Sequence, residues 1–300
     1  MPAPTVSVLM TSYNHEQYIG EAIESVLAST FADFELIIVD DCSHDQTPAI
    51  ARQYARTDRR IHVVTNAKNL GDYPNRNQAA SYATGTYLKY LDADDLLYPH
   101  SLAIFVSSMD SHPDAALGLS SYVVQHPQPF PLHFPPGAAF RYHFFIQGFL
   151  DCGPSGTIIR REIFAQQGGF SGKRMVGDTE LWMKIAASHP VIIVPPGLFF
   201  WRQHAGQESA AGEQMGVFLA RTLPMIQEAL QYPGVQLTAA EKQQVLGYFR
   251  SLTARKILQR AWRRRQVKEA LALYRGLQLR GADLWHAVVG TRWRGYAFRL

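Results

Sequence analysis

The sequence predicts an α/β fold in which a mostly parallel central sheet carries helices on both faces. Three observations predict it. Short runs rich in Val, Ile and Leu alternate along the chain with segments whose apolar residues recur at helical spacing. These short runs are apolar throughout, as strands covered on both faces must be. A chain of 300 residues with 47% hydrophobic and 18% charged residues also suffices for a substantial core.

The first hundred residues alternate strands and helices regularly. Segment 19–27 is the clearest helix, because its apolar residues recur at i, i+3 and i+4 and therefore share one face. The strand segments are dominated by β-branched and long apolar residues. The expected strands are 6–13, 35–41, 61–65 and 86–91, and the expected helices are 19–27, 47–55 and 75–83.

The second half is less regular. Segment 125–137 contains five prolines in 13 residues, and we expect it to be a loop because proline cannot donate to a strand ladder. From about residue 208 the pattern is helical to the end. The expected strands are 115–124, 156–160, 191–195 and 198–202, and the expected helices are 141–150, 161–167 and 178–187.

Charge divides the chain into two unequal regions. Residues 251–300 hold 12 Lys and Arg against two Asp and Glu, a net charge of +10, whereas the first 250 residues hold 17 basic and 23 acidic groups, a net charge of −6. We therefore expect a domain over residues 1–209 and a basic helical region over residues 210–300.

The number of cysteines and the first residues of the chain bear on the cellular compartment of the protein. Two cysteines, Cys42 and Cys152, provide neither a disulfide framework nor a zinc cluster. Strand-like sequence begins by Val6, which leaves no room for a signal peptide, and no apolar run reaches membrane-spanning length. A cytoplasmic protein is expected.

Three carboxylates follow the fourth strand in TYLKYLDADDLL (86–97). Asp92, Asp94 and Asp95 stand within four positions, although like charges this close repel one another. A divalent cation would stabilise the arrangement, since Mg²⁺ and Mn²⁺ prefer hard oxygen ligands. The alternative is a solvated strand-to-helix turn with an Asp cap.

Other polar residues end the neighbouring strands. Thr11 and Tyr13 close the first strand, and Asp40 and Asp41 close the second. Ligands of doubly wound sheets gather at the carboxyl ends of the strands, so these groups are expected to meet Asp92 and its neighbours at one edge. Their convergence favours a metal-dependent site over an isolated cap.

Five blocks of the chain resemble family 2 glycosyltransferases, which have the Rossmann-like GT-A fold. The blocks are TSYNHEQYIGEAIESVLASTFADFELIIVDDCSHDQT, NLGDYPNRNQAASYATGTYLKYLDADDLLYP, GTIIRREIFAQQGGF, GDTELWMKIA and WRQHAGQES. They stand in the family's order over about residues 5–209. The resemblance implies a nucleotide-binding half over 1–110 and an acceptor-side half over 111–209.

The resemblance implies roles for the residues that would hold the nucleotide. Thr11 and Tyr13 match positions that cradle the base, with the tyrosine stacking on it, and Asp41 matches the residue that hydrogen-bonds the base, usually uracil. Asp92 matches the first Asp of the Asp-x-Asp motif, facing ribose and diphosphate. Arg76 starts the Arg-Asn helix, where pairing with phosphate and pairing with a carboxylate are equally open.

Three further positions carry the implied chemistry. Asp94 matches the second Asp of the motif, which holds Mn²⁺ or Mg²⁺, and His204 matches a residue near the metal or the diphosphate. Asp178 matches the general base that deprotonates the acceptor hydroxyl. The family commonly has Glu-Asp at this point, whereas this chain has Gly177 before the Asp, and Glu180 either compensates or faces solvent.

The implied activity is metal-dependent, inverting transfer of a sugar from a nucleotide diphosphate, expected to be a UDP-sugar, to a hydroxyl of a glycan or lipid-linked glycan. A Lewis-acidic metal stabilises charge on the leaving diphosphate, the sugar becomes oxocarbenium-like, and one carboxylate takes the acceptor's proton. Direct displacement with a single base inverts the anomeric centre.

Each of these residues also has a purely structural interpretation. Asp40 suits a helix cap or a partner for a backbone amide, and Asp41 suits a cap. Tyr13 suits a packed rim aromatic, His204 a surface histidine, and Asp178 a charge at a helix start. Trp182 suits the core better than an acceptor platform.

Two rival functions remain open. A nucleotidyltransferase usually has a Gly-rich basic loop after its first strand, and TSYNHEQY differs from that. The other rival is a non-catalytic nucleotide-sugar binding protein, and Gly177 in place of an acid is the one feature that favours it. A dinucleotide dehydrogenase is disfavoured, because no G-x-G-x-x-G follows a strand.

The segment 254–280 contains nine basic residues and one Glu among apolar residues at helical spacing. A solvated helix packed on the domain is one reading. A helix at the membrane surface is another, because basic amphipathic helices with Trp bind anionic headgroups. It would place the protein at the inner face of the membrane, near a lipid-linked acceptor. No recognition motif accompanies the charge, so nucleic acid is not an expected partner.

Overall fold

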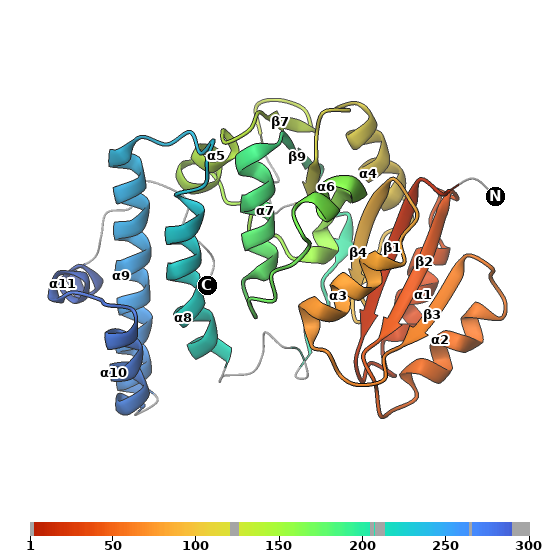
Figure 1. Cartoon of the computed structure of the whole chain (residues 1–300), viewed down its shortest axis with the longest axis horizontal. Coiled ribbons are helices and arrows are strands. Elements are labelled where there is room, and N and C mark those ends of the chain that lie inside the picture. Colours follow the sequence, from red (N-terminus) through yellow and green to blue (C-terminus); the bar gives the residue numbers. More distant parts are fainter. Residues whose placement is uncertain (1–2, 121–125, 205–206, 208–213, 264–265, 290–300) are drawn as a thin grey trace.

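The computed structural model describes residues 3–120, 126–204, 207, 214–263 and 266–289. An eight-stranded sheet runs through the first two thirds of the chain, with helices on both faces (Figure 1). Its strands are β1 (Val6–Ser12), β2 (Phe34–Asp40), β3 (Ile61–Thr65), β4 (Tyr87–Asp92), β6 (Leu117–Ser120), β7 (Leu132–Phe134), β8 (Thr157–Arg160) and β9 (Val191–Val194). Their order is β3-β2-β1-β4-β8-β6-β9-β7.

The helices follow the expected alternation, with one further helix over residues 101–110 that the sequence pattern did not predict. Those around the sheet are α1 (Ile19–Leu27), α2 (Thr47–Ala55), α3 (Asp72–Ser81), α4 (Ser101–Asp110), α5 (Ala139–Phe145), α6 (Arg161–Gln166) and α7 (Gly177–Ser188). The C-terminal helices are α8 (Gln214–Ala229), α9 (Ala239–Arg263), α10 (Val267–Gly276) and α11 (Gly281–Val289). This arrangement confirms the predicted α/β class and the helical C-terminal region.

Two apolar cores lie on opposite faces of the sheet, because successive side chains of a strand point to opposite sides. On β1, Val8 and Met10 join the core formed with α1, α2 and α4. Leu9, between them, joins the core formed with α3, α5, α6 and α7. Burial on both faces explains why these strands read as continuous apolar runs.

Parallel pairing of β2, β1 and β4 brings three strand ends to one edge. Thr11 lies in register with Val39 of β2 on one side and with Asp92 of β4 on the other, and Ser12 is paired with Asp40. The polar residues that the sequence placed after these strands therefore meet, as predicted.

The prediction of a loop over 125–137 was wrong in part. Residues Leu132–Phe134 form β7, which pairs antiparallel with β9 at the end of the sheet, and residues 121–125 lie outside the described part of the chain. The prolines at 131 and 135 flank this short strand, and an edge strand needs donors on one side alone. Proline density thus marked the borders of the strand.

Several other expected elements differ in extent. The predicted helix 141–150 is the shorter α5, and the predicted strand 115–124 is observed as β6, while residues 121–124 lie outside the described part of the chain. Helix α3 begins at Asp72, three residues before the predicted start, after Gly71 with a φ of 88°. The predicted strand 198–202 is reduced to β10 (Phe199–Phe200), which leaves the main sheet and pairs with β5 (Leu96–Leu97). This small ladder ties the segment before His204 to the acidic turn.

The C-terminal helices pack against the α7 side of the sheet (Figure 1). Their buried residues Leu223, Phe249 and Ile257 belong to the same apolar cluster as Leu9. The division of the chain at residue 209 stays a prediction. In the described part of the chain, no helix combines the length and the apolar character needed to cross a bilayer.

The apolar residues of the basic segment 254–280 are of two kinds, buried and exposed. Ile257 packs inward, whereas Leu258, Trp262 and Val267 are exposed, Trp262 at 88%. The interpretation of this segment as a helix packed on the domain is therefore correct for one face of α9. The other face presents apolar side chains to solvent.

Candidate active site

The acidic turn after β4 gathers three carboxylates. The amide of Asp95 donates to the carbonyl of Asp92 at 3.0 Å, which folds the turn tightly. Asp92, Asp94 and Asp95 each offer one carboxylate oxygen, and these oxygens lie within 4.8 Å of one another. The three side chains then diverge in their remaining contacts.

Asp94 and His204 lie together, as the sequence predicted. Oδ2 of Asp94 is 2.9 Å from Nε2 of His204, and both side chains are largely buried. The guanidinium of Arg202 donates to the carbonyl of Asp94 at 2.9 Å and holds the His204 segment against the turn. The reading of His204 as an isolated surface histidine is wrong.

The donor set of this turn fits Mn²⁺ or Mg²⁺. Carboxylate oxygens suit both ions, and an imidazole nitrogen suits Mn²⁺ as a borderline ligand. Burial, followed by the negative charges of Asp92 and Asp94, raises the pKa of Asp95 to about 7. A cation between the carboxylates would offset this repulsion.

Arg76 links the turn to α3. Its Nε donates to Oδ1 of Asp72 at 2.7 Å, and its Nη1 lies 2.6 Å from Oδ1 of Asp92. Pairing with carboxylates, one of the two readings left open, is thus observed. The Arg76 guanidinium is itself buried, whereas Asp92 remains partly exposed at this edge.

Lys89 is a charged residue of the site that sequence reasoning missed. It is completely buried in β4, and its Nζ donates to the carbonyls of Tyr90 and Ser155 at 2.5 and 2.6 Å. Burial lowers its pKa to about 7, opposed by the nearby Asp92 and Asp95. A lone lysine inside an otherwise apolar strand was the signal that could have revealed it.

The end of β1 carries the two residues predicted to cradle a base. Thr11 is buried in the middle of the edge, whereas Tyr13 is 42% exposed. Asn14 follows with a φ of 55°, and its amide donates to Ser43 after β2. The two strand ends are therefore joined.

Asp40 and Asp41 have distinct roles. Asp40 is fully buried and accepts from the amide and hydroxyl of Ser43, so it is the partner of a backbone amide and does not cap α2, whose N-cap is Gln46. Asp41 accepts from the amides of Leu70 and Gly71, both at 2.8 Å. Oδ1 of Asp41 also accepts from Nδ2 of Asn66 at 2.8 Å. Asp41 thus fixes the loop before α3, and Oδ2, with a single donor, keeps lone-pair capacity for a ligand.

Asp178 lies in the first turn of α7. Its Oδ1 accepts from the amide of Thr179 at 2.7 Å and from the hydroxyl of Tyr73 at 3.3 Å. Removal from bulk water raises its pKa to about 6, with Asp72 adding to the rise and Arg76 opposing it. A carboxylate with a pKa near neutrality is suited to accept a proton.

Two neighbours of Asp178 on α7 are structural. Glu180 is buried, accepts from the hydroxyl of Ser171 and pairs with Lys173 at 2.6 Å, so it neither faces solvent nor compensates for Gly177. Trp182 is completely buried and donates to the carbonyl of Cys152, which confirms its core reading.

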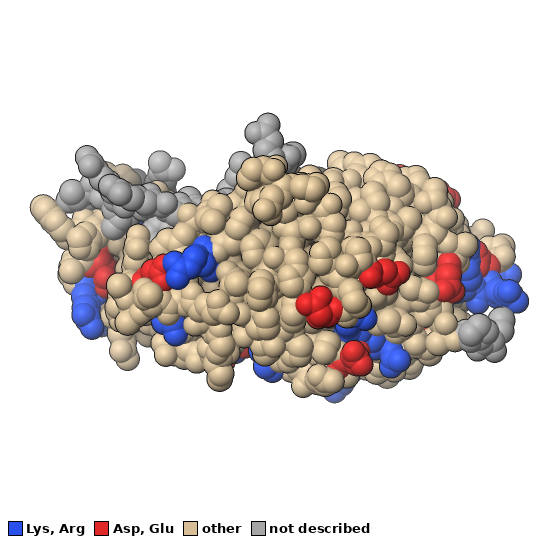
Figure 2. Space-filling view, turned by 90° about the horizontal axis from the view of Figure 1, so that it is seen from above, with Lys and Arg blue, Asp and Glu red and all other residues tan. Residues whose placement is uncertain are grey.

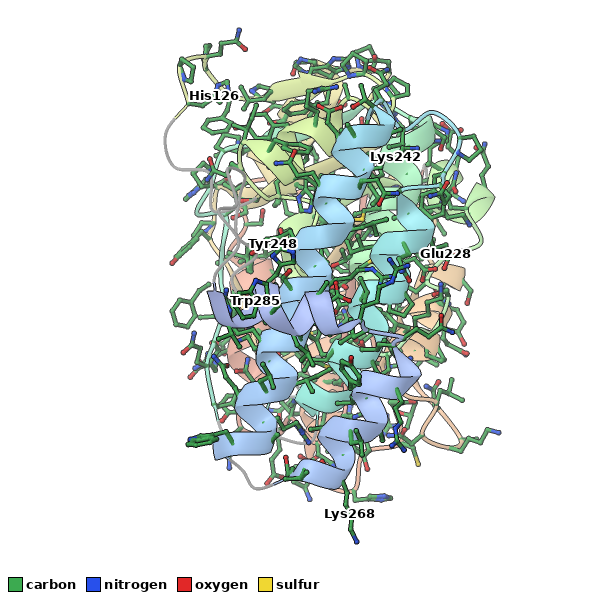
Figure 3. All side chains as sticks on the ribbon, turned by 90° about the vertical axis from the view of Figure 1, so that its left-hand side faces the viewer. His126, Glu228, Lys242, Tyr248, Lys268 and Trp285 are labelled. Atoms are coloured by element: carbon green, nitrogen blue, oxygen red, sulfur yellow. The ribbon has the colours of Figure 1, made fainter. Side chains whose placement is uncertain are left out.

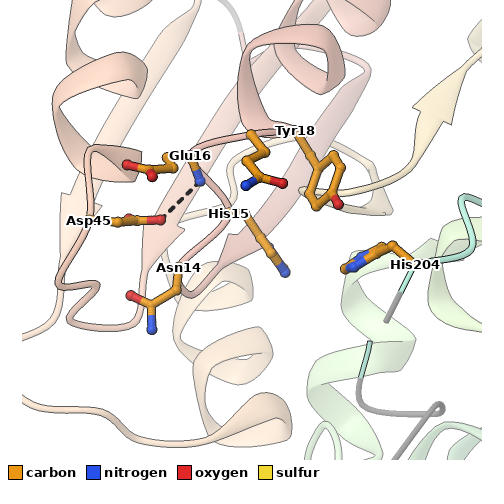
Figure 4. A pocket seen from close by; sticks show the side chains of 7 residues that line it. Asn14, His15, Glu16, Tyr18, Asp45 and His204 are labelled. Atoms are coloured by element: carbon orange, nitrogen blue, oxygen red, sulfur yellow. Dashed lines mark hydrogen bonds between the residues drawn. The ribbon is translucent and has the colours of Figure 1, made fainter. Parts of the chain in front are cut away.

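A cavity of about 360 Å³ opens beside His204 (Figure 4). His15 and Tyr18, just before α1, point toward His204, and the Tyr18 and His204 rings lie 4.5 Å apart. Sequence reasoning identified His204 and missed the other lining residues, which no motif marked. The lining residues are Asn14, His15, Glu16, Gln17, Tyr18, Asp45 and His204.

Comparison with known proteins agrees with this geometry. The family model described as Glycosyl transferase family 2 matches residues 7–168. The putative teichuronic acid biosynthesis glycosyltransferase TuaG of Bacillus subtilis is 47% identical over 92 residues, 31% of this chain and 36% of that protein. The Escherichia coli UDP-Glc:alpha-D-GlcNAc-diphosphoundecaprenol beta-1,3-glucosyltransferase WfgD is 38% identical over 104 residues, 35% of this chain and 40% of that protein. The matches thus span well under half of these relatives.

Solved structures show the same fold. TarS 1–349 of S. aureus in complex with UDP-GlcNAc superposes with a TM-score of 0.60 at 22% identity, over 82% of this chain and 71% of that one. The mannosyltransferase PcManGT of Pyrobaculum calidifontis, in complex with GDP-Man and Mn²⁺, gives a TM-score of 0.60 at 18% identity, over 96% and 87%. The GT-A fold implied by the sequence is confirmed.

Proposed function

The chain belongs to glycosyl transferase family 2, and from that premise we propose that it transfers a sugar from a nucleotide diphosphate, preferentially a UDP-sugar, to an acceptor hydroxyl. The observation that carries the proposal is the convergence at one sheet edge of a cation-type carboxylate cluster, an exposed aromatic and, across α3, a carboxylate whose pKa is about 6. The carboxylate cluster would hold the metal, the aromatic would stack on the base, and the carboxylate of Asp178 would take the proton of the acceptor.

The donor would lie along the ends of β2, β1 and β4. Tyr13 offers a face for the base, Asp41 an acceptor for its N–H, and Arg76 with Asp92 the contacts to ribose and diphosphate. Asp94 and His204 would hold the metal. When bound, Mn²⁺ or Mg²⁺ neutralises the charge that develops on the leaving diphosphate.

Asp178 would take the proton of the acceptor. The acceptor oxygen forms a bond to the anomeric carbon as the carbon–oxygen bond to the diphosphate breaks, and the hydroxyl proton passes to the carboxylate. Attack from the side opposite the diphosphate inverts the anomeric configuration. A pKa near 6 leaves the carboxylate largely ionised at neutral pH while keeping it basic enough to work.

Asp178→Asn tests this assignment. The amide preserves the shape of the side chain and cannot accept the proton, so we expect turnover of UDP-sugar to fall by roughly 10³-fold or more, with UDP affinity unchanged. Release of UDP measures turnover, and calorimetry measures affinity. Wild-type protein that binds nucleotide without any turnover would favour the non-catalytic binding protein, and full activity of the variant would remove Asp178 from the mechanism.

The acceptor is proposed to be a glycan carried on a lipid. WfgD is named for a diphosphoundecaprenol-linked acceptor, and TuaG for teichuronic acid biosynthesis. The helical end of this chain supports the same choice. Trp262 on α9 and Trp285 on α11 are 88% and 66% exposed. Lys268 and Arg275 are exposed on α10, and Arg280 is exposed between α10 and α11.

The exposed groups gather at one end of the molecule. Figure 3 looks onto α9, α10 and α11, where Trp285 and Lys268 point away from the helices. On the face shown in Figure 2, acidic and basic side chains are interspersed over a mostly uncharged surface. We propose that this end lies on an anionic membrane surface, at its cytoplasmic face.

A further inference from the structure

The hydroxyl of Tyr73 makes three hydrogen bonds at the start of α7. It accepts from the amides of Gly177 at 3.0 Å and Asp178 at 3.2 Å, and it lies 3.3 Å from Oδ1 of Asp178. A phenol has one hydrogen to donate. Because two N–H groups already point at its oxygen, that hydrogen is directed at the carboxylate of Asp178.

The same contacts satisfy groups that a helix leaves without partners. The first amides of α7 have no carbonyl within the helix to bond, and Tyr73 binds two of them. Its ring is buried and packs on Phe170 at 5.1 Å, which fixes the position of the hydroxyl. The first turn of α3 therefore holds the first turn of α7.

Gly177 is required by the ring of Tyr73. A Cβ at position 177 would lie 2.8 Å from Cε2 and 3.0 Å from Cζ of Tyr73, too close for any side chain unless the ring moved. The acid that the family commonly has at this position and the tyrosine ring cannot occupy this space together. Tyr73 and Gly177 thus form one matched pair.

We propose that Tyr73 is the positioning residue of the catalytic base, its hydroxyl standing where other family members place an acidic side chain beside Asp178. This inference rests on the proposed function. With Oδ1 held by Tyr73 and by the amide of Thr179, the rotation of the carboxylate is fixed, and among the described residues none has a hydrogen bond to Oδ2. Oδ2 is then the oxygen that takes the acceptor's proton.

Other charged groups also act on Asp178. Asp72, next to Tyr73, opposes its ionisation, whereas Arg76 favours it, and the buried thiol of Cys152 also senses its charge. The Tyr73 hydroxyl favours ionisation by donating to the carboxylate. Removing this hydrogen bond should therefore raise the pKa of Asp178.

Tyr73→Phe in the full chain tests the inference, because it keeps the ring and removes the hydroxyl. We expect kcat for a UDP-sugar to fall roughly 10-fold or more, with KM for the donor unchanged, since one hydrogen bond to a charged group is lost. The acid limb of the pH profile, near pH 6 in wild type, should move to higher pH. Tyr82→Phe, on an exposed ring at the other end of α3, is the matched control and should behave as wild type.

A second pair of variants tests the matching of positions 73 and 177. Gly177→Glu alone should abolish turnover because it displaces the ring, whereas Tyr73→Ala with Gly177→Glu should recover at least 10-fold over that single variant. The inference would be overturned if Tyr73→Phe had the same kcat and the same acid limb as wild type. It would also be overturned if the effects of Tyr73→Ala and Gly177→Glu on turnover were additive in the double variant. A wild-type protein without turnover would instead overturn the proposed function, so the two failures are distinguishable.

Discussion

Asp178 and Asp95 are both carboxyls with raised pKa values, and their settings differ. Asp95 is buried beside two other carboxylates, accepts from the amide of Arg202 and has the buried Lys89 nearby. Asp178 stands apart from that cluster, at a helix start, with donors on one oxygen. Repulsion within the cluster is what a cation would relieve, whereas Asp178 lies outside the cluster, where we propose that it acts as the base.

The pH dependence of turnover follows from Asp178. Its pKa is raised to about 6, so the carboxylate is protonated below that pH and cannot accept the acceptor's proton. Turnover at saturating metal and donor should therefore rise tenfold per pH unit up to about pH 6 and then level off. Steady-state rates between pH 4.5 and 8 measure this, with circular dichroism at each pH as the control for folding. A flat profile through pH 6 would contradict the role of Asp178.

At the scale of elements, two glycines join the C-terminal helices to the sheet domain. Gly234, between α8 and α9, has a φ of 92°, and a Cβ there would overlap the carbonyl oxygen of Ala187 at the end of α7. Its own carbonyl lies against Gly137, before α5. Arg141 on α5 pairs with Glu241 on α9 close to this contact.

Gly234→Ala should destabilise the protein by on the order of 2 kcal/mol, because it combines a strained backbone with a clash against the main chain. Gly247→Ala is the matched control. Gly247 is exposed within α9 with open space around it, so alanine should stabilise by about 0.5 to 1 kcal/mol. Urea unfolding of both variants measures the difference. Equal stability of the two variants would show that the close contact at Gly234 is absent in solution.

The regular elements could be predicted because their pattern is local. Helix α1 and strand β3 match the expected bounds, since periodicity and β-branched content fix them. The start of α3 could not be predicted, because it depends on Asp41 binding the amides of Leu70 and Gly71 from another strand end. The edge strand β7 was hidden by prolines that border it.

In the candidate site, too, some features could be predicted from the sequence and others depend on distant contacts. The resemblance predicted Asp94 at the metal and His204 near the metal or the diphosphate, and the pairing of their side chains is observed at 2.9 Å. Lys89 and Tyr73 were missed, because their roles come from contacts with Ser155 and with α7, far away in sequence. Long-range contacts of this kind leave no local pattern.

At the scale of the whole molecule, the sheet edge and the exposed tryptophans belong to different regions. The acidic turn ends β4, whereas Trp262 and Trp285 lie on α9 and α11, at the far end in Figure 1. An elongated arrangement of this kind would let one end contact a surface while the site stays open to nucleotide.

Binding to vesicles tests the membrane proposal. The full chain should sediment with vesicles that contain phosphatidylglycerol and remain in solution with phosphatidylcholine alone, and 0.5 M salt should reduce binding. Trp262→Ser with Trp285→Ser should weaken binding at least 10-fold, because both side chains would insert at the headgroups. Ile146→Ser, an exposed apolar residue on the α5 side, should have no effect. Equal binding to neutral vesicles, or by the double variant, would contradict the proposal.

The central claim is that the sheet edge binds a nucleotide diphosphate through a metal held at Asp94. The measurement that tests it most directly is the melting temperature of the full chain with UDP, GDP, TDP and CDP, each with and without Mn²⁺, for wild type and Asp94→Asn. Ligand that binds the folded state raises this temperature by mass action. We expect a rise of several degrees with UDP and Mn²⁺ together, a much smaller rise with either alone, and none for the variant. Equal rises without Mn²⁺ or in the variant, or no rise with any nucleotide, would contradict it.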